Sequence, residues 1–233
     1  MEFTSVIKDQ YKNGGNNKNM AIVIDGIIGA GKSTVGKFLS ESLDLPIFEE
    51  LKSDGKDSLA QRMLDLFYEE PSRWSAIIQV MFLNDRFKDI KRIEAMGNRA
   101  ILDRSIYGDE IFAKTIHDRG QMTNDEYMIY KNVLHNMLEH IKVPEVLIYI
   151  DVSVDTALHR INFRGRSTEG DLIPRDYLVD LQKNYEAWFE AFDLCPKIRL
   201  DLNESVLGDD GIVKEEVRVN LLKALEPYLK RGI

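Results

Sequence analysis

The sequence has a single cysteine, no long apolar run and no excess of positive charge. With only Cys195 available, the 233-residue chain cannot form an intramolecular disulfide, and we expect a reducing, cytoplasmic location. No apolar stretch approaches the roughly 20 residues that cross a membrane, and the first residues lack the apolar core of a signal peptide. The net charge of −8 argues against a sequence-independent grip on a nucleic acid polymer or on a membrane, because both need a basic surface.

Histidine is also scarce, and the histidines present suggest neither a metal centre nor a catalytic triad. None of the 4 histidines lies at the spacing of a metal-ligand set or of a histidine that pairs with a nucleophile. We therefore expect structural or solvent-facing roles for His117, His135, His140 and His159.

Short apolar runs alternate with amphipathic stretches along the chain, which predicts an α/β fold. Residues 1–19 are rich in Asn, Lys and Gly, so we expect a flexible tail there and a single domain over residues 20–233. Strands that alternate with helices indicate a parallel sheet with right-handed crossovers, and hence three α/β/α layers. The expected strands are residues 21–24, 46–48, 100–102, 146–150 and 198–200.

The first expected strand leads into a glycine-rich loop with the pattern G-x-x-x-x-G-K-[ST]. In this setting the loop N–H groups and the following helix end bind phosphate oxygens, Lys32 reaches the β- and γ-phosphates, and Ser33 ligates Mg²⁺. A chance glycine-rich turn is the alternative, which the strand–loop–helix context disfavours. We therefore predict a P-loop NTPase-type fold that binds ATP with Mg²⁺ through Gly26, Gly29, Ala30, Gly31, Lys32, Ser33 and Thr34.

Polar side chains follow the second and third expected strands, at the sheet edge where ligands gather in parallel sheets. Glu50 can orient an acceptor hydroxyl and accept its proton as the general base, with Glu49 as the alternative. Asp103 can hold Mg²⁺ through water, and Arg104 can bind a transferring phosphoryl group. A surface pair of glutamates and a structural Asp–Arg pair are the simpler interpretations.

A long helix-forming stretch carries polar residues on one face. Gln79 and Arg86 are seven positions apart, which is two helical turns. A glutamine amide donates and accepts at once, so it can pair with a nucleobase edge. Together with Asp109 these residues form a candidate base-reading set, although a core glutamine and an ordinary salt bridge would give the same pattern.

An arginine-rich stretch follows the fourth expected strand and its helix. Arg160, Arg164 and Arg166 are followed by polar residues, a composition that suits a lid over about residues 160–173. Such a lid closes over donor phosphates and excludes water, and its arginines grip the phosphates. A solvated basic face is the alternative.

Taken together, these residues resemble the deoxyribonucleoside kinases, a family that includes deoxycytidine, deoxyguanosine and bacterial deoxyadenosine kinases. The likeness covers about residues 20–200. Residues 68–79 resemble the family's Tyr…Pro…Arg-Trp-Ser…Gln segment, and Arg86 follows at the family's spacing. Residues 103–109 resemble its (Asp/Glu)-Arg-Ser…Asp block, and residues 164–178 resemble its lid.

The resemblance implies a kinase that transfers the γ-phosphoryl group of ATP to the 5′-hydroxyl of a deoxynucleoside, with Lys32, Glu50 and Arg104 as catalytic residues. The implied roles are Glu50 as the base, Tyr68 and Glu169 on the 3′-hydroxyl, Gln79, Arg86 and Asp109 on the nucleobase, Arg104 on the 5′ oxygen and phosphates, Ser33 and Asp103 on Mg²⁺, Arg164 and Arg166 on the donor phosphates, and Trp74 as a pocket wall or a core residue.

Two positions depart from the family's pattern. Leu51 follows Glu50 where the family usually has proline, which keeps Glu49 open as the base. Residues 167–170 of the lid read Ser-Thr-Glu-Gly, where relatives often have two consecutive acids. The role of Glu169 therefore depends on one carboxylate.

The resemblance also bears on the substrate and the assembly. Thymidine-accepting relatives tend to have smaller or apolar residues at the positions of Arg86 and Asp109. A charged pair favours a base with an amino group or a purine edge, so we expect deoxyadenosine first, then deoxyguanosine, with deoxycytidine as a further candidate. We expect a homodimer by resemblance and from the wide apolar stripe of residues 127–141, unless that stripe faces the core.

Two other functions share part of this pattern. A thymidylate-type nucleotide kinase has the same loop, an Asp-Arg block and a lid, but its acceptor already carries a phosphate. A nucleotide-binding switch without kinase activity needs the loop alone.

Overall fold

A parallel β-sheet forms the centre of the molecule. The computed structural model describes residues 21–50, 58–97, 99–164, 173–204 and 213–229, and in this part of the chain the sheet has 5 strands in the order β2-β3-β1-β4-β5. All four neighbouring pairs are parallel, as predicted. The strands are β1 (Ala21–Asp25), β2 (Ile47–Phe48), β3 (Ala100–Asp103), β4 (Val146–Asp151) and β5 (Lys197–Asp201).

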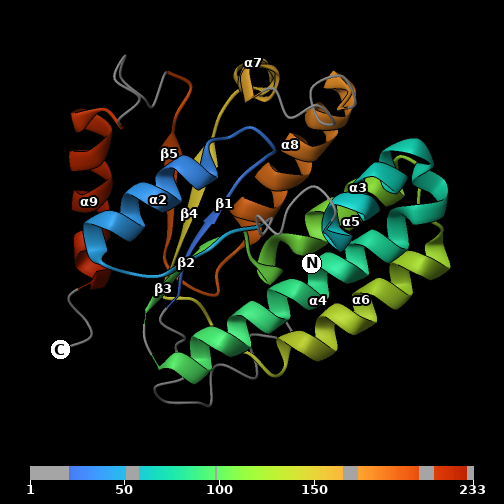
Figure 1. Cartoon of the computed structure of the whole chain (residues 1–233), viewed down its shortest axis with the longest axis horizontal. Coiled ribbons are helices and arrows are strands. Elements are labelled where there is room, and N and C mark those ends of the chain that lie inside the picture. The colour runs from blue at the N-terminus through green and yellow to red at the C-terminus, as the bar shows by residue number, and fades with distance from the viewer. Residues whose placement is uncertain (1–20, 51–57, 98, 165–172, 205–212, 230–233) are drawn as a thin grey trace.

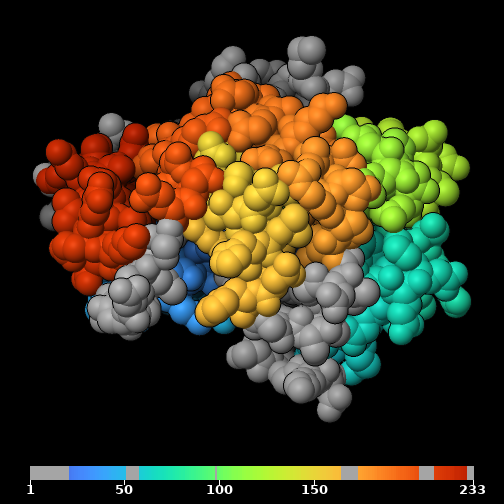
Figure 2. Space-filling view, turned by 90° about the horizontal axis from the view of Figure 1, so that it is seen from above, coloured from blue at the N-terminus to red at the C-terminus, as the bar shows by residue number. Residues whose placement is uncertain are grey.

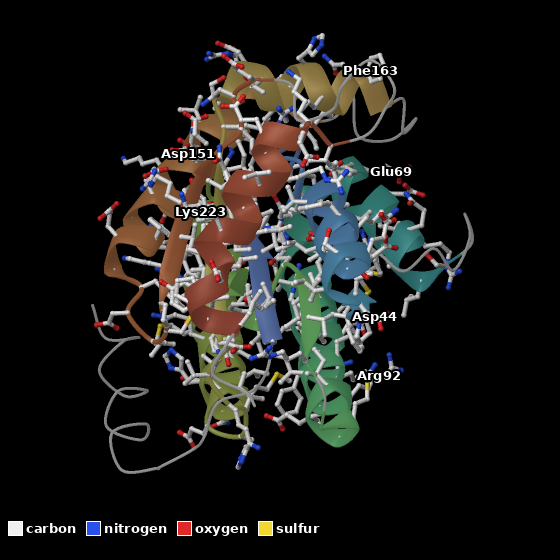
Figure 3. The ribbon with its side chains drawn as sticks, turned by 90° about the vertical axis from the view of Figure 1, so that its left-hand side faces the viewer. Asp44, Glu69, Arg92, Asp151, Phe163 and Lys223 are labelled. Atoms are coloured by element: carbon white, nitrogen blue, oxygen red, sulfur yellow. The ribbon has the colours of Figure 1, made fainter. Side chains whose placement is uncertain are left out.

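Helices cover both faces of the sheet, which confirms the predicted three layers. In Figure 1, α2 and α9 lie on one side of the sheet, and α4, α5, α6 and α8 lie on the other. Figure 3 shows α2 and α9 side by side in front of the strands, with α7 at the top. The helices are α2 (Lys32–Leu43), α3 (Leu59–Glu69), α4 (Pro71–Met96), the 3-10 helix η1 (Ile106–Gly108), α5 (Asp109–Asp118), α6 (Asn124–Leu138), α7 (Val154–Arg164), α8 (Arg175–Ala191) and α9 (Glu215–Leu229).

The central strands are buried along their whole length. All five residues of β1 and all four residues of β3 are buried, because helices cover both faces. This is why the two strands appear in the sequence as continuous apolar runs rather than as alternating ones. Asp25 and Asp103 are the last residues of the two strands, so two buried carboxylates lie at the carboxyl edge of the sheet.

Local signals in the sequence set several helix ends. Ser58 accepts a hydrogen bond from the Gln61 N–H group at the start of α3, and Thr123 forms a capping box with Glu126 at the start of α6. Pro71 occupies the first position of α4, where its missing N–H group costs nothing.

The apolar stripe of residues 127–141 packs inward. Tyr130, Leu134 and Leu138 are buried, and α6 packs against α4 and α5. The exposed apolar residues of α6 are instead Met128 and Ile129. The stripe itself therefore does not supply a surface for dimer formation.

Two regional predictions fall on residues outside the described part of the chain. These are the tail of residues 1–19 and most of the lid of about residues 160–173. Among the described residues, no helix is both long enough and apolar enough to cross a membrane.

Candidate active site

The glycine-rich loop joins β1 to α2 and packs tightly against α7. Gly29 has φ +79°, and a Cβ atom there would lie 2.5 Å from the Ala157 carbonyl oxygen. Side chains at this position would both clash and strain the backbone. In Figure 2 the yellow atoms of α7 lie against the blue segment that contains the loop. The shape of the loop is therefore fixed by a neighbouring helix as well as by its own sequence.

Lys32 lies inside the loop, as the phosphate-binding motif requires. Its side chain is only 6% exposed, and Nζ donates to the carbonyl oxygens of Gly26 at 3.4 Å and Ile27 at 3.2 Å. Burial, helped by the positive charge of Arg104, lowers the pKa of Lys32 to about 8. The ammonium group is therefore still mostly charged at neutral pH and available to triphosphate oxygens.

Ser33 and Asp103 meet across the gap between α2 and β3. The Ser33 hydroxyl donates to Asp103 Oδ2 at 2.6 Å, while the buried Asp103 Oδ1 has no hydrogen-bond partner among the described residues. Hard oxygen donors of this kind suit Mg²⁺, which usually takes one or two protein ligands and completes its shell with water and phosphate oxygens. The described residues contain no cluster of three acidic, histidine or cysteine ligands.

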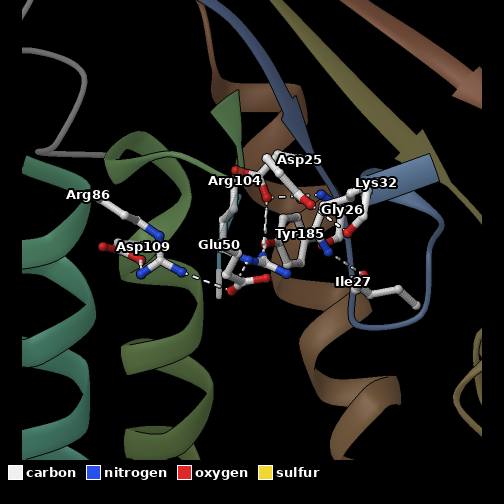
Figure 4. Close-up of polar contacts among 11 residues, drawn as sticks. Asp25, Gly26, Ile27, Lys32, Glu50, Arg86, Arg104, Asp109 and Tyr185 are labelled. Carbon is white, nitrogen blue, oxygen red and sulfur yellow. Dashed lines mark hydrogen bonds and ion pairs between the residues drawn. The ribbon is translucent and has the colours of Figure 1, made fainter. Parts of the chain in front are cut away.

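Glu50 lies between two arginines at the end of β2. Its Oε1 is 2.6 Å from Arg104 Nε and 3.0 Å from Arg86 Nη2, as Figure 4 shows. Glu49 instead forms an ion pair with Lys37 of α2, at 3.3 Å. Successive side chains of an extended segment point in opposite directions, so only Glu50 reaches the cluster.

The charge of Glu50 is stabilised by its neighbours. Burial acts to raise the pKa of Glu50, but Arg104, Lys32 and Arg86 together outweigh it and lower the pKa to about 2. The carboxylate is therefore ionised at neutral pH. Because folding lowers this pKa, the ionised Glu50 carboxylate stabilises the folded state at pH values above its ordinary pKa of 4.5. This stabilisation is lost as the pH falls toward about 2.

Arg86 also pairs with Asp109 at the start of α5. Arg86 Nη1 lies 2.5 Å from Asp109 Oδ1, and the guanidinium group lies 5.2 Å from the ring centroid of Phe82. Burial raises the pKa of Asp109 to about 7, although Arg86 opposes the shift. The two residues that the sequence predicted as a pair are therefore in contact and buried, and Arg86 also contacts Glu50.

A cleft of about 130 Å³ opens beside these charges. The ends of β2 and β3, the start of α3 and one face of α4 line it, and Phe82 forms part of its apolar wall. Its charged lining residues are Glu49, Glu50, Asp85, Arg86, Asp89, Asp103 and Arg104. The cleft therefore joins the Mg²⁺ candidates to the general-base candidate.

Three other predicted residues lie on α3 and α4 and make no described contact with this cluster. Gln79 is buried on α4, on the same helix face as Arg86. Tyr68 and Trp74 are half-buried; Tyr68 packs on Phe67, and the Arg73 guanidinium group lies 5.1 Å from the Trp74 ring. Their roles on the sugar and the base stay predictions.

Arg160 contacts backbone carbonyl groups in the structure, and its expected role as a phosphate clamp stays a prediction. It donates to the carbonyl oxygens of Ala30, Leu202 and Glu204, at 2.9, 2.6 and 2.9 Å. It therefore fastens α7 to the glycine-rich loop and to the end of β5. The side chain of Arg164 and the residues Arg166 and Glu169 lie outside the described residues.

Asp25 and Tyr185 were not among the predicted site residues, yet both contact Arg104. Asp25 Oδ1 lies 3.2 Å from Arg104 Nη1 and accepts a hydrogen bond from the Tyr185 hydroxyl at 2.8 Å. Arg104 Nη1 also donates to the Tyr185 oxygen. The position of Asp25, at a strand end directly before the loop, is a signal that could have pointed to it, whereas Tyr185 has only the pattern of one apolar position of a helix.

Comparison with known proteins identifies the family of the chain. The family model described as deoxynucleoside kinase matches residues 22–225. The chain is 38% identical to a deoxyguanosine kinase of Lactobacillus johnsonii, covering 90% of this chain and 92% of the relative, and 33% identical to a deoxyadenosine/deoxycytidine kinase of Bacillus subtilis, covering 86% and 91%.

Solved structures agree with the sequence matches. The structure of deoxyadenosine kinase from M. mycoides with the products dCMP and dCDP bound has a TM-score of 0.74 and 27% identity, and covers 89% of this chain and 100% of its own. Its dATP-bound form has a TM-score of 0.71 over the same shares of both chains. The chain therefore belongs to the deoxynucleoside kinase family and, as its motifs predict, is an ATP-dependent deoxynucleoside kinase.

Proposed function

We propose that this kinase acts on purine deoxynucleosides, with deoxyadenosine as the preferred acceptor, deoxyguanosine next and deoxycytidine a weaker one. The observation that carries the proposal is the buried pair of Arg86 and Asp109, 2.5 Å apart and joined to Glu50 through Arg86. Charged donors and acceptors at this position suit an amino group or a purine edge and leave no apolar space for a thymine methyl group. The deoxyguanosine, deoxyadenosine and deoxyadenosine/deoxycytidine kinases among the relatives support the same range.

In the reaction we propose, Glu50 accepts the proton of the acceptor 5′-hydroxyl as its oxygen forms a bond to the γ-phosphorus and the bond to ADP breaks. The contacts that join Glu50 to the two arginines are both to Oε1, so Oε2 is the oxygen that we propose accepts the hydroxyl proton. A carboxylate with a pKa of about 2 is a weak base, so proton transfer comes late, which suits a loose phosphoryl-transfer transition state.

Lys32 and Arg104 bind the phosphates from two sides. Lys32 lies in the loop, and Arg104 lies at the end of the neighbouring strand with its Nη2 buried and without a hydrogen-bond partner among the described residues. Mg²⁺, when bound, neutralises charge on the donor phosphates, and Ser33 and Asp103 are the residues that would hold it. In this proposal Tyr68, Gln79, Trp74 and Glu169 complete the acceptor pocket, and Arg164 and Arg166 the donor site.

The acceptor preference can be measured with a panel of four deoxynucleosides and dTMP, using ATP and Mg²⁺. We expect kcat/KM to be highest for deoxyadenosine and at least about 10-fold lower for thymidine, because one mismatched polar contact costs more than about 1.4 kcal/mol. In an Arg86→Met/Asp109→Ala double variant, this ratio should fall toward unity. A wild-type enzyme that prefers thymidine, or a ratio that the double variant leaves unchanged, would contradict the proposal.

The Mg²⁺ site can be tested through Ser33. In Ser33→Ala we expect the Mg²⁺ concentration for half-maximal rate to rise several-fold, on the order of the 10-fold effects that loss of a metal-orienting group produces. Ser40→Ala is the matched control, because the Ser40 hydroxyl bonds the Leu45 carbonyl at the far end of α2. Equal Mg²⁺ dependence in the two variants would remove Ser33 from the site.

The assembly we propose is a homodimer. Ile77 and Val80 of α4 and Met128 and Ile129 of α6 are exposed apolar side chains on two helices that pack together, and exposed apolar patches mark interfaces. Light scattering should give twice the 26.8 kDa chain mass, and Ile77→Glu with Ile129→Glu should give the monomer. Monomer mass in the wild type would refute the dimer. The cytoplasmic location stays a prediction.

A further inference from the structure

We propose that Asp25 and Tyr185 are positioning residues, which hold the Arg104 guanidinium group in the one orientation that faces Glu50 and the donor phosphates together. The inference depends on the proposed roles of Glu50 and Arg104. It adds two residues, from β1 and α8, that contact neither substrate in the proposed reaction.

One carboxylate oxygen of Asp25 receives three donors. Oδ1 accepts from the Gly26 N–H group at 2.9 Å, from the Tyr185 hydroxyl at 2.8 Å and from Arg104 Nη1 at 3.2 Å. The side chains of Asp25, Tyr185 and Arg104 are all buried, and Asp25 and Tyr185 are 0% exposed. The first peptide group of the phosphate loop and the arginine of the acceptor side are thus joined through a single atom (Figure 4).

The carboxylate of Asp25 packs closely against Gly108 of η1. A Cβ atom on Gly108 of η1 would overlap Asp25 Oδ2, so the second oxygen is pressed against backbone. Because the carboxylate is fixed by its surroundings, it can serve as a rigid anchor for the groups that bond to it.

Arg104 is held along its whole length. Its φ angle of +73° is in the left-handed region, which is unfavourable for a non-glycine residue, and its N–H group donates to the Ile24 carbonyl at 2.8 Å. The guanidinium group lies 4.4 Å from the ring centroid of Phe112. With Nη1 held by Asp25 and Tyr185 and Nε facing Glu50, Nη2 is the atom left for a ligand.

The charge of Asp25 also affects Glu50. Without Asp25, the buried Arg104 cation would lose the carboxylate at 3.2 Å and keep Glu50 at 2.6 Å, and a tighter pair with Glu50 would make that carboxylate a poorer proton acceptor. Sharing the cation between two carboxylates leaves Glu50 available to the acceptor hydroxyl. Asp25 thus acts on the reaction through Arg104, without contact with the reacting atoms.

The test compares Tyr185→Phe with Tyr149→Phe. Both tyrosines are buried and stack on one another with ring centroids 6.0 Å apart. The Tyr149 hydroxyl, however, forms its hydrogen bond with Glu186 and not with the Asp25–Arg104 cluster. We expect Tyr185→Phe to lower kcat by about 10-fold with both KM values within about 3-fold, and Tyr149→Phe to keep kcat within about 2-fold. Asp25→Asn keeps an acceptor oxygen for Gly26 but removes the charge, and it should lower kcat at least as much.

A double-mutant cycle separates positioning from a purely structural role. In an Arg104→Lys background, Tyr185→Phe should lower kcat by less than about 2-fold, because the group through which it acts is already lost. The same loss in both backgrounds, or wild-type kcat in Tyr185→Phe and in Asp25→Asn, would overturn the inference. Wild-type kcat in Arg104→Lys alone would instead refute the proposed role of Arg104, so the two failures are distinguishable.

Discussion

Replacement of Glu50 by glutamine is expected to lower kcat at least about 100-fold, the usual contribution of a positioned general base. Glutamine has nearly the same shape and keeps an oxygen within reach of Arg86 and Arg104, which lie 3.0 and 2.6 Å from Glu50 Oε1 in the wild type. What it loses is the ability to take up a proton. The KM values for ATP and for deoxyadenosine should therefore change little, and single-turnover rates should fall as much as kcat.

The matched control for this variant is Glu49→Gln. Glu49 is the neighbouring residue and pairs with Lys37 at the surface, so its loss should change kcat by no more than about 2-fold, in line with the small energy of such pairs. A large loss in Glu49→Gln together with full activity in Glu50→Gln would assign the base to Glu49. This is the alternative that the missing proline after Glu50 left open.

Replacement of Arg104 by methionine is expected to have the largest effect on stability. The Arg104 side chain is completely buried between Glu50 and Asp25. Its loss leaves two carboxylates without their cation, which costs about 3–5 kcal/mol when a buried pair is broken. We expect a clear drop in the urea midpoint, and a kcat at least about 100-fold lower because the phosphoryl group loses a cationic contact.

Arg119→Met is the control for the stability effect. Arg119 also contacts two carboxylates, Asp176 at 2.7 Å and Asp180 at 2.5 Å, but these lie at the surface. Surface ion pairs contribute at most about 1 kcal/mol, so its urea midpoint should stay close to that of the wild type at equal protein concentration. Equal midpoints for the two variants would show that the Arg104 cluster does not stabilise the fold.

The predicted site residues that the structure brings together share one property, which is that they follow directly from a motif or from a strand end. The glycine-rich loop, Glu50, Asp103 and Arg104 all lie at the carboxyl edge of a parallel sheet, and strand order alone brings them together. Which of the two glutamates contacts Arg104 needed the structure, because it depends on which way each side chain points from the segment after β2.

The residues that the sequence did not locate depend on packing between distant elements. Tyr185 and Asp25 are 160 positions apart, and only the packing of α8 beside β1 brings the hydroxyl to the carboxylate. Likewise, the arginine-rich composition of the stretch predicted a cationic clamp that includes Arg160. It could not show that Arg160 donates to backbone carbonyl oxygens. Periodicity places a residue on a helix face, and the neighbour of that face is a tertiary property.

The family match resolves the choice among the three functions considered for the sequence. The deoxynucleoside kinase model extends over residues 22–225, well beyond the loop that a nucleotide-binding switch would share. It therefore includes the acceptor side of the cleft, where Glu50, Arg86 and Asp109 lie.

Several buried polar atoms around the cleft lack hydrogen-bond partners among the described residues: Arg86 Nε, Asp103 Oδ1, Arg104 Nη2 and Asp109 Oδ2. A ligand that supplies partners to these atoms adds hydrogen bonds, each of which contributes about 0.5–1.5 kcal/mol. Because such a ligand binds the folded chain and not the unfolded one, it raises the melting temperature. Thermal shift alone should therefore rank nucleosides by fit, without any assay of turnover.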